Sequence, residues 1–296
     1  MLKRKGIILA GGSGSRLSPI TTTVSKHLLQ VYDKPMIYYP ISTLMLAGIR
    51  DILIISTPEH IELYKNLIKN IGKIGVEFKF LVQETPRGIA HGLILAENFL
   101  NGSPCALILG DNLFYGNNFS NLLNQADKNE NGAYIFSYKV KNPNKYGVLK
   151  FNRNGELVSI IEKPKVFVSN FVVTGLYFYD THAVELAKKL KPSKRGELEI
   201  TDLNLQYIKN NALKVINLNR GFAWLDTGTP QGLLDSANFI ATIEKRQGIK
   251  ISCLEEIALH KSWINIINFK NLPNYDTNSE YGRYLINLAD DFNEDK

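Results

Sequence analysis

The alternation of short apolar segments with helical patterns constrains the fold of this chain more than any other feature. Apolar segments of strand length lie at 6–10, 51–56, 76–82 and 105–109, and helical patterns separate them at 39–47, 59–69 and 88–99. Apolar strands that alternate with helices are typical of a parallel sheet covered on both faces. Such sheets bind ligands at the carboxyl ends of their strands. We therefore expect a ligand site along that edge of the sheet.

The pattern changes after Asp111, where strand-like segments follow one another with short polar turns between them. They lie at 133–140, 146–151, 156–161 and 171–179, followed by a helical pattern at 199–210 and a strand at 214–218. These segments predict an antiparallel or mixed section of the same sheet. From Pro230 the pattern is mainly helical, at 231–247 and 255–263, and we expect the tail at 290–296 to be frayed. One α/β domain with a C-terminal helical appendage fits this organisation.

Charge and composition narrow the class of protein. Lys and Arg number 35 and Asp and Glu 28 in 296 residues, so the net charge is +7. This excess points to an anionic partner, either a nucleic acid or a phosphorylated small molecule. The two cysteines, Cys105 and Cys253, have no metal-ligand spacing and are expected to be buried apolar residues. The sequence shows neither a signal-peptide core nor a membrane-spanning run, so we expect a cytoplasmic protein.

A glycine-rich loop follows the first strand and is the first candidate site. It comprises Gly11, Gly12, Ser13, Gly14, Ser15 and Arg16. Glycines let backbone N–H groups close around an anion such as phosphate, and a guanidinium can bind phosphate through two hydrogen bonds. The loop matches neither GxGxxG nor a Walker A motif, and a tight turn is the alternative interpretation. Lys26, ten residues later, is a second candidate for phosphate binding.

Acidic residues form a second group of candidates. Asp111 follows the strand at 105–109, which places a carboxylate at the carboxyl end of a buried strand. With Asp226 it makes a hard oxygen pair of the kind that Mg²⁺ prefers next to a phosphate. The alternative for each aspartate is a turn or a helix cap. Glu162 and Lys163 close another strand, and Arg195 begins an acidic helical segment; sugar or anion contacts and ordinary surface charges are both open interpretations.

Together these motifs resemble the glucose-1-phosphate thymidylyltransferases, a family of sugar-nucleotide pyrophosphorylases. The resemblance spans most of the chain in the family's order. It is carried by the segments 9–17, 25–26, 32–40, 42–50, 109–112, 146–147, 162–164, 173–180, 195–202, 224–229 and 243–248. The tyrosine-rich segment 32–40 and the segment 195–202 are the most specific of these.

The resemblance implies a nucleotide-diphospho-sugar transferase fold, which is a Rossmann-like mixed sheet flanked by helices. It implies a catalytic domain at 1–229, whose nucleotide-binding part is about 1–112 and whose sugar-binding part is about 113–229. The helical segment 230–296 would form an oligomer interface, since the family is commonly homotetrameric. The implied reaction converts dTTP and α-D-glucose 1-phosphate into dTDP-glucose and pyrophosphate with Mg²⁺, as a first step towards dTDP-rhamnose or other deoxysugars.

The resemblance also assigns roles to residues of this sequence. Arg16 and Lys26 face the triphosphate, Lys163 and Arg195 face the sugar phosphate, and Asp111 and Asp226 hold the metal. Gln83 and Gly88 read the thymine edge. The glucose is held by Asn112, Tyr146, Gly147, Glu162 and Val173. The remaining predicted contacts to substrate come from Leu9, the glycine loop, His27 and Pro86.

The sequence departs from the family's pattern at several positions. His27 follows the catalytic lysine where the family usually has Gln, and Gly88-Ile-Ala-His-Gly92 replaces Gly-Leu-Ala-Gln-Ala. A feedback site for dTDP-L-rhamnose, found in the family at a subunit interface, is matched at Tyr39, Gly116, Arg220, Ser252 and Glu256. Ser120 and His260 stand where the family often has His and Arg.

Three alternative functions remain at the level of sequence. One is a pyrophosphorylase that uses UTP or another hexose 1-phosphate. Another is a non-catalytic nucleotide-sugar sensor, which would not need to retain Asp111, Asp226, Lys26 and Lys163. The third is a nucleic-acid binder, which the charge alone suggests and no binding motif supports.

Overall fold

The parallel half of the sheet is formed by the four strands expected from the first half of the chain. The computed structural model describes residues 3–12, 14–128 and 131–294. Strands β1 (Lys5–Leu9), β4 (Asp51–Ser56), β5 (Glu77–Val82) and β6 (Cys105–Leu109) lie in the order β5-β4-β1-β6, and every neighbouring pair is parallel. The chain leaves β1 towards β4 on one side and returns to β6 on the other. Their carboxyl ends therefore share one edge, with a topological switch point at β1.

The second half of the chain extends this sheet, and the expected mixed section is confirmed. Strand β11 (Phe171–Tyr179) runs antiparallel to β6 and also pairs with β8 (Ala133–Lys139) and β9 (Gly147–Phe151). Strand β10 (Leu157–Glu162) is antiparallel to β9, and β12 (Leu213–Leu218) is parallel to β8. Within the described residues the result is a single nine-stranded sheet.

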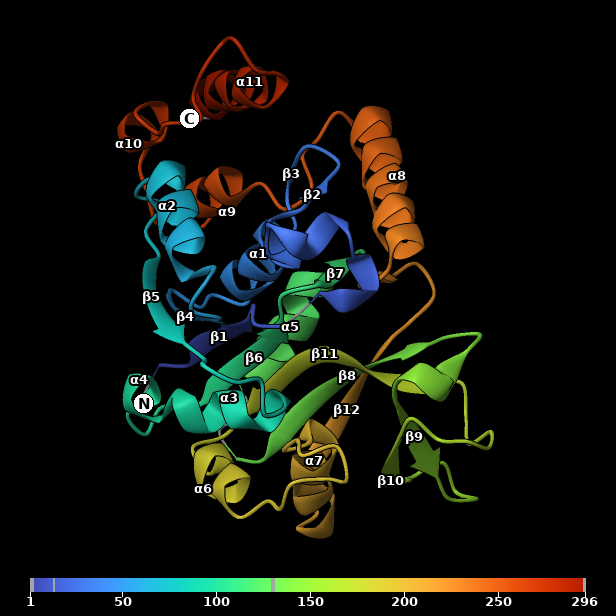
Figure 1. The fold of residues 1–296 in the computed structure, drawn as a ribbon. Helices are drawn as coiled ribbons and strands as arrows, with labels where there is room; N and C mark the ends of the chain where they lie inside the picture. Colours follow the sequence, from blue (N-terminus) through green and yellow to red (C-terminus); the bar gives the residue numbers. More distant parts are fainter. Residues whose placement is uncertain (1–2, 13, 129–130, 295–296) are drawn as a thin grey trace.

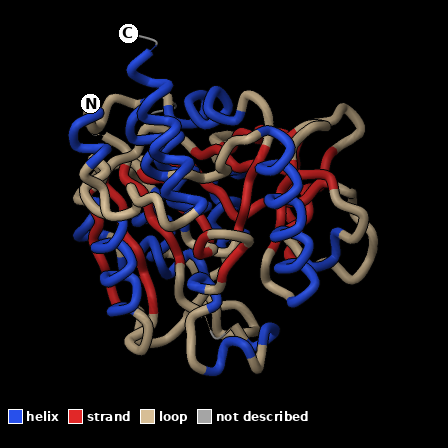
Figure 2. Tube along the Cα trace, turned by 90° about the horizontal axis from the view of Figure 1, so that it is seen from above, coloured by secondary structure: helices blue, strands red, loops and turns tan. Residues whose placement is uncertain are grey.

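Side chains alternate between the two faces of the sheet, and helices cover both faces. Ile8 and Ile54 point into one core cluster, whereas Ile7 and Leu53 point into the other. The first cluster includes residues of α1 (Tyr38–Leu46), α2 (Ile61–Ile71) and α5 (Phe119–Asp127), and the second includes residues of α3 (Ile89–Leu95), α6 (Ala183–Lys188) and α7 (Ile200–Lys209). Figure 1 shows α1 and α2 on one side of the strands and α3, α6 and α7 on the other, and Figure 2 shows the strands running between helices.

The C-terminal segment is helical, as expected, and packs onto the first core cluster. Helices α8 (Pro230–Gln247), α9 (Leu254–His260), α10 (Ile266–Lys270) and α11 (Glu280–Glu294) follow one another. Helix α9 packs against α1, and Leu254, Phe269 and Leu285 belong to the same cluster as the strands. The domain division at residue 229 and the role in oligomerisation stay predictions. No helix among the described residues has the length and apolarity to cross a bilayer.

Several local predictions were wrong. The helix expected at 88–99 is interrupted at Ala96, which separates α3 from α4 (Glu97–Leu100). The helix expected to reach residue 263 ends at His260, and Ser262 adopts a left-handed backbone with φ +55°. The tail is helical through Glu294 rather than frayed, because Leu285 and Ala289 on one face of α11 are buried in the core; residues 295–296 lie outside the described part. Cys105 and Cys253 are free and buried, which confirms their expected role.

Two very short ribbons were not predicted. Strands β2 (Gln30–Val31) and β3 (Lys34–Pro35) form one, and β7 (Asn112–Tyr115) with β13 (Ala223–Asp226) forms the other. The β7–β13 register places Asp226 opposite Asn112. Residues more than a hundred positions apart therefore meet at the end of β6.

We expect Ile8→Ala in β1 to lower the free energy of unfolding by about 2–5 kcal/mol, because it removes a fully buried side chain from the centre of the sheet. Val158→Ala in β10 is the control, since Val158 is 43% exposed and its truncation is expected to cost under about 0.5 kcal/mol. Urea denaturation followed by far-UV circular dichroism measures both. Equal costs for the two variants would contradict the assignment of the core.

Candidate functional site

A cavity of about 750 Å³ lies at the carboxyl ends of the parallel strands. Leu9 and Gly11 reach it from the end of β1, Gln83 from the end of β5, and Leu109 and Asp111 from the end of β6. The cavity is also lined by the following residues predicted from sequence: Ser15, Arg16, Lys26, His27, Pro86, Gly88, Asn112, Tyr146, Gly147, Glu162, Lys163, Val173, Arg195 and Asp226. Gly12 and Gly14 belong to the loop beside the cavity but do not line it, and Ser13 lies outside the described residues. The sheet therefore gathers nearly all predicted site residues in one place.

The glycine loop turns the chain sharply after β1. Gly14 has φ +58°, a left-handed conformation that favours glycine, and it precedes a short 3-10 turn at Ser15–Leu17. The Thr21 hydroxyl donates to the Gly14 carbonyl at 2.9 Å and so ties the loop to the segment that follows it. Arg16 is exposed, and its guanidinium reaches Gly228, where an added Cβ would lie 2.7 Å from Nη2. Glycine at 228 therefore leaves the space that Arg16 needs beside Asp226.

Lys26 and Asp111 form a shielded ion pair at the centre of the cavity wall. The Lys26 Nζ lies 2.5 Å from Asp111 Oδ2, and Asp111 is only 8% exposed. Burial opposes ionisation of Asp111, but the Lys26 charge and hydrogen bonds from Lys26 and Asn112 outweigh it and lower the Asp111 pKa to about 2. Asp111 is therefore a carboxylate at any physiological pH. The neighbouring His27 is neutral, because burial and then the Lys26 charge lower its pKa to about 3.

Asp226 faces the same centre from β13. Burial and then the negative charge of Asp111 raise the Asp226 pKa, although the Gly228 N–H and Arg16 act in the opposite direction. Two carboxylates thus repel each other across the cavity wall. The described residues contain no group of three or more His, Cys, Asp and Glu that could hold a metal. Mg²⁺, however, commonly takes only one or two carboxylates from a protein and the remaining ligands from water and substrate phosphate.

Asn112 ties β7, β11 and β13 together behind the carboxylates. Its Oδ1 accepts from the Gly175 N–H at 2.9 Å and from the Trp224 Nε1–H at 2.7 Å, and its Nδ2 donates to Asp111 Oδ1 at 3.0 Å. All of these contacts are buried. Asn112 therefore holds Asp111 in position, and Asn112 itself also lines the cavity.

A second charged group lies at the sugar-binding end predicted from sequence. Glu162 at the end of β10 lies 3.6 Å from Lys163 Nζ and 3.8 Å from Arg195 Nη2, and it accepts from the Thr201 hydroxyl at 2.7 Å. The side chains of Lys163 and Arg195 are 49% and 44% exposed, and Arg195 Nη2 also donates to both carboxylate oxygens of Glu199 at 2.9 Å. The cavity lining thus contains two mixed groups of charges, one of Asp111 and Asp226 with Lys26 and Arg16, and one of Glu162, Glu197 and Glu199 with Lys163 and Arg195.

Comparison with known proteins accounts for this arrangement. A family model described as nucleotidyl transferase matches residues 5–243. The glucose-1-phosphate thymidylyltransferase of Neisseria meningitidis is 51% identical over 284 residues, which cover 96% of this chain and 99% of the relative. The enzyme of the same name from Mycobacterium tuberculosis is 46% identical and covers 97% of this chain and 99% of the relative. The chain belongs to the glucose-1-phosphate thymidylyltransferase family of nucleotidyl transferases.

Solved structures agree with this family assignment. The crystal structure of a provisional glucose-1-phosphate thymidylyltransferase from Bacillus anthracis, in complex with a sucrose, matches with a TM-score of 0.72 at 38% identity. The match covers 80% of this chain and 94% of that one. A UDP-glucose pyrophosphorylase complexed with UDP-glucose shares the fold, with a TM-score of 0.71 at 24% identity, over 83% of this chain and 100% of that one.

Sequence reasoning missed several residues that line the cavity of this family member. These are Ile89, Leu109, Lys145, Thr174, Gly175, Tyr177, Glu197, Glu199, Ile200, Thr201, Asn204 and Trp224. Lys145 follows a proline turn directly before the predicted Tyr146, so its place beside the site could have been inferred. Thr201 and Asn204 are brought in by the packing of α7 against β10, which no local pattern indicates.

The residues predicted for feedback regulation have different surroundings. Tyr39 is buried and donates to the Val31 carbonyl, whereas Ser252 shares a hydrogen bond with Ser42. Gly116 lies against the Phe222 ring, and Arg220 is exposed. Glu256 accepts from the Tyr284 hydroxyl at 2.9 Å and lies 3.8 Å from His260. A regulatory role for these five residues stays a prediction.

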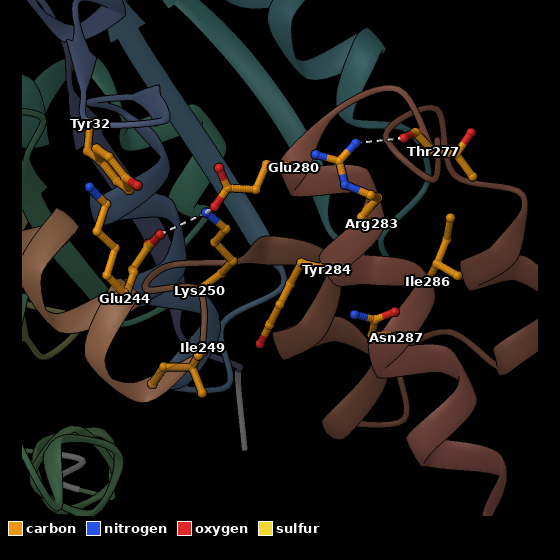
Figure 3. A pocket seen from close by; sticks show the side chains of 12 residues that line it. Tyr32, Glu244, Ile249, Lys250, Thr277, Glu280, Arg283, Tyr284, Ile286 and Asn287 are labelled. Atoms are coloured by element: carbon orange, nitrogen blue, oxygen red, sulfur yellow. Dashed lines mark hydrogen bonds and ion pairs between the residues drawn. The ribbon is translucent and has the colours of Figure 1, made fainter.

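A second cavity, of about 530 Å³, lies between the end of α8 and α11 (Figure 3). Lys250 in its wall donates to Asp33 at 2.6 Å and to Glu244 at 3.0 Å, and Glu244 also accepts from Lys34 at 3.0 Å. These four charges compensate one another and join the β2–β3 ribbon to the C-terminal helices. Their contacts give them a structural role.

We expect Asn112→Ala to lower the free energy of unfolding by about 2 kcal/mol or more, because the N–H groups of Gly175 and Trp224 lose their acceptor and each buried unsatisfied donor costs roughly 1–3 kcal/mol. Urea denaturation gives the cost, and tryptophan fluorescence of the native state should change as the Trp224 N–H loses its partner. Asn154→Ala, at an exposed turn, is the control. An unchanged unfolding midpoint for Asn112→Ala would contradict this network.

Proposed function

We propose that the chain transfers a deoxythymidylyl group from dTTP to α-D-glucose 1-phosphate and gives dTDP-glucose and pyrophosphate. The observation that carries the proposal is the match, at about half identity and nearly full length, to enzymes named for this reaction. The cavity supports it independently, because its lining combines the carboxylates Asp111 and Asp226 with the cations Arg16, Lys26, Lys163 and Arg195, which suit phosphorylated substrates and a metal ion. The excess positive charge of the chain is consistent with anionic substrates of this kind.

The reaction needs no nucleophile from the protein. An oxygen of the sugar phosphate attacks the α-phosphorus of dTTP, a new P–O bond forms, and the bond to the pyrophosphate leaving group breaks. Because both reactants are anions, positioning and neutralisation of charge supply the catalysis. Arg16 and Lys26 bind the triphosphate, and Lys163 and Arg195 bind the sugar phosphate. Glu162 holds a glucose hydroxyl, with its carboxylate oriented by Thr201.

The two aspartates that line the cavity fit a magnesium ion. Asp111 and Asp226 would hold it, since both are hard oxygen donors and the repulsion between them is relieved by a cation. When bound, Mg²⁺ polarises phosphate oxygens and neutralises the charge that develops on them. Lys26 keeps Asp111 ionised and in place for this role.

A panel of substrates tests the proposal and separates it from its rivals. Pyrophosphate release is measured with dTTP, UTP, CTP and GTP against glucose, galactose and mannose 1-phosphates, with and without Mg²⁺. We expect the highest kcat/KM for dTTP with glucose 1-phosphate, and loss of turnover on chelation. A preference for UTP or for another hexose 1-phosphate would contradict the proposed substrates but would still support the proposed type of reaction. Activity with none of the pairs would favour a nucleotide-sugar sensor.

Two substitutions test the assigned chemistry. Asp111→Asn and Lys163→Ala are each expected to lower turnover by orders of magnitude, because the first removes a charge from the metal site and the second a cation from the sugar phosphate. Lys163→Ala is the clearer test, since its exposed side chain contributes little to folding.

Lys165→Ala is the matched control for Lys163→Ala. Lys165 is also exposed, is two positions away, and does not line the cavity. Its turnover should stay close to that of the wild type. Near-wild-type pyrophosphate release from Lys163→Ala, with unchanged circular dichroism, would overturn the site assignment.

The wider setting is part of the same proposal. We propose a cytoplasmic homotetramer whose interface includes the helices from Pro230, and a product that enters the synthesis of dTDP-rhamnose or other dTDP-deoxysugars for cell-surface polysaccharide. The alternatives are a UTP-dependent or other hexose 1-phosphate pyrophosphorylase and a non-catalytic sensor. The ion-paired Lys26 and Asp111 and the exposed Lys163 favour the enzyme, because a sensor would not need both groups of phosphate-binding residues.

A further inference from the structure

Glu199 binds one edge of the Arg195 guanidinium. Nη2 of Arg195 donates to both carboxylate oxygens of Glu199 at 2.9 Å, and Nε donates to Oε1 at 3.3 Å. The carboxylates of Glu162 and Glu197 also come closest to Nη2, at 3.8 and 3.7 Å. Every one of these contacts is made by Nε or Nη2. Among the contacts of the described residues, Nη1 and its two N–H groups have no partner.

Glu199 is held in turn by the segment that carries Arg195. The Ser193 hydroxyl donates to Glu199 Oε1 at 2.7 Å, and Ser193 Oγ accepts from the Arg195 backbone N–H at 3.2 Å. The roles of donor and acceptor are fixed here, because a carboxylate paired with a guanidinium only accepts and a backbone N–H only donates. Glu199 is also the N-cap residue of α7, but its side chain makes no capping hydrogen bond. Its carboxylate therefore serves Arg195 and Ser193 rather than the helix.

This arrangement leaves one part of the guanidinium for a ligand. A guanidinium carries five N–H donors in a single plane, and Glu199 occupies the edge formed by Nε and Nη2. The two N–H groups of Nη1 lie outside that edge. Arg195 lines the cavity together with Lys163, so Nη1 can donate to a phosphate oxygen bound there.

The contact also orders a side chain that would otherwise be mobile. Arg195 is 44% exposed, and a long exposed side chain loses conformational freedom when a ligand immobilises it, which weakens binding. A carboxylate that already fixes the plane of the guanidinium removes much of this cost. The negative charge of Glu199 opposes an anion, but charges at an exposed pair are screened by water and salt. Orientation is therefore expected to outweigh charge.

We propose that Glu199 is a positioning residue of the sugar-phosphate site. It holds the Arg195 guanidinium by the edge of Nε and Nη2, so that Nη1 is presented to the phosphate of the sugar substrate. The inference rests on the proposed function, in which Arg195 binds this phosphate. Glu199 itself does not bind the phosphate, because two anions repel, so its effect passes through Arg195.

Glu199→Gln and Glu197→Gln separate orientation from charge. Each removes one negative charge from a residue that lines the cavity beside Arg195, but only Glu199 is hydrogen-bonded to it. Both oxygens of Glu199 accept from Arg195, so either orientation of the new amide sets its NH₂ group against an Arg195 N–H. The measurement is KM for glucose 1-phosphate and for dTTP, each with the other substrate and Mg²⁺ saturating.

For Glu199→Gln we expect KM for glucose 1-phosphate to rise at least about threefold, while KM for dTTP changes less than about twofold. For Glu197→Gln we expect no rise in KM for glucose 1-phosphate, since loss of a negative charge favours an anion. Thermal unfolding of each variant confirms that the compared proteins are folded.

Three results would overturn the proposal. Equal rises in the two variants would show that the hydrogen bonds of Glu199 have no special part. A lower KM for glucose 1-phosphate in Glu199→Gln would show that Glu199 competes with the phosphate for Arg195 instead of presenting it. A rise in KM for dTTP as large as that for glucose 1-phosphate would show a general disturbance of the cavity.

Arg195→Ala and the double variant Arg195→Ala/Glu199→Gln complete the test. If Glu199 acts through Arg195, the double variant should bind glucose 1-phosphate no worse than Arg195→Ala alone, and a further rise in KM would contradict this. An unchanged KM in Arg195→Ala would overturn both the inference and the assignment of Arg195 to the sugar phosphate. A raised KM in Arg195→Ala with an unchanged KM in Glu199→Gln would overturn the inference alone and leave the proposed function intact.

Discussion

The parallel pairing of β1 with β4 on one side and β6 on the other is the constraint on which the site depends. Because all three strands point the same way, the segments that follow them emerge at one edge. That edge receives the glycine loop after β1 and Asp111 after β6, and β5 adds Gln83. The helices that cover both faces keep the edge as the open part of the sheet. The position of the cavity thus follows from strand direction before any side chain is considered.

The charged residues of the cavity differ in how far they are shielded from solvent. Lys26 and Asp111 are shielded and paired, so each fixes the other, and Asn112 adds a buried connection to Gly175 and Trp224. Lys163 and Arg195 are 49% and 44% exposed, and Arg195 donates to both oxygens of the Glu199 carboxylate at 2.9 Å. Exposed ion pairs are screened by water and salt, whereas a shielded pair is screened much less. The Lys26–Asp111 pair is therefore held more strongly by its charges than the pairs around Arg195.

Much of the fold was predictable because its signals are local. The strands at 51–56, 105–109 and 171–179 were predicted to the residue, since continuous apolar runs bounded by polar turns leave little choice. The β7–β13 ribbon was missed because strands of four residues are too short to show a clear alternation of apolar and polar residues. The ribbon nevertheless places Asp226 beside Asn112. The helical tail was missed because its stability comes from burial of Leu285 against distant elements. The site residues were found through motif resemblance, and their contacts, such as Thr201 with Glu162, required the folded chain.

The residues that line the cavity differ in how many contacts hold them in place. Asp111 and Asn112 are connected by hydrogen bonds to Lys26, Gly175 and Trp224, so a change at either residue disturbs several elements at once. The Gln83 side chain, in contrast, has a single polar partner, His91, among the contacts of the described residues. Of the two departures from the family pattern, His27 lies beside Lys26 and Asp111, and His91 lies behind Gln83. The cavity therefore combines positions that the fold holds by several buried contacts with positions that it holds by few.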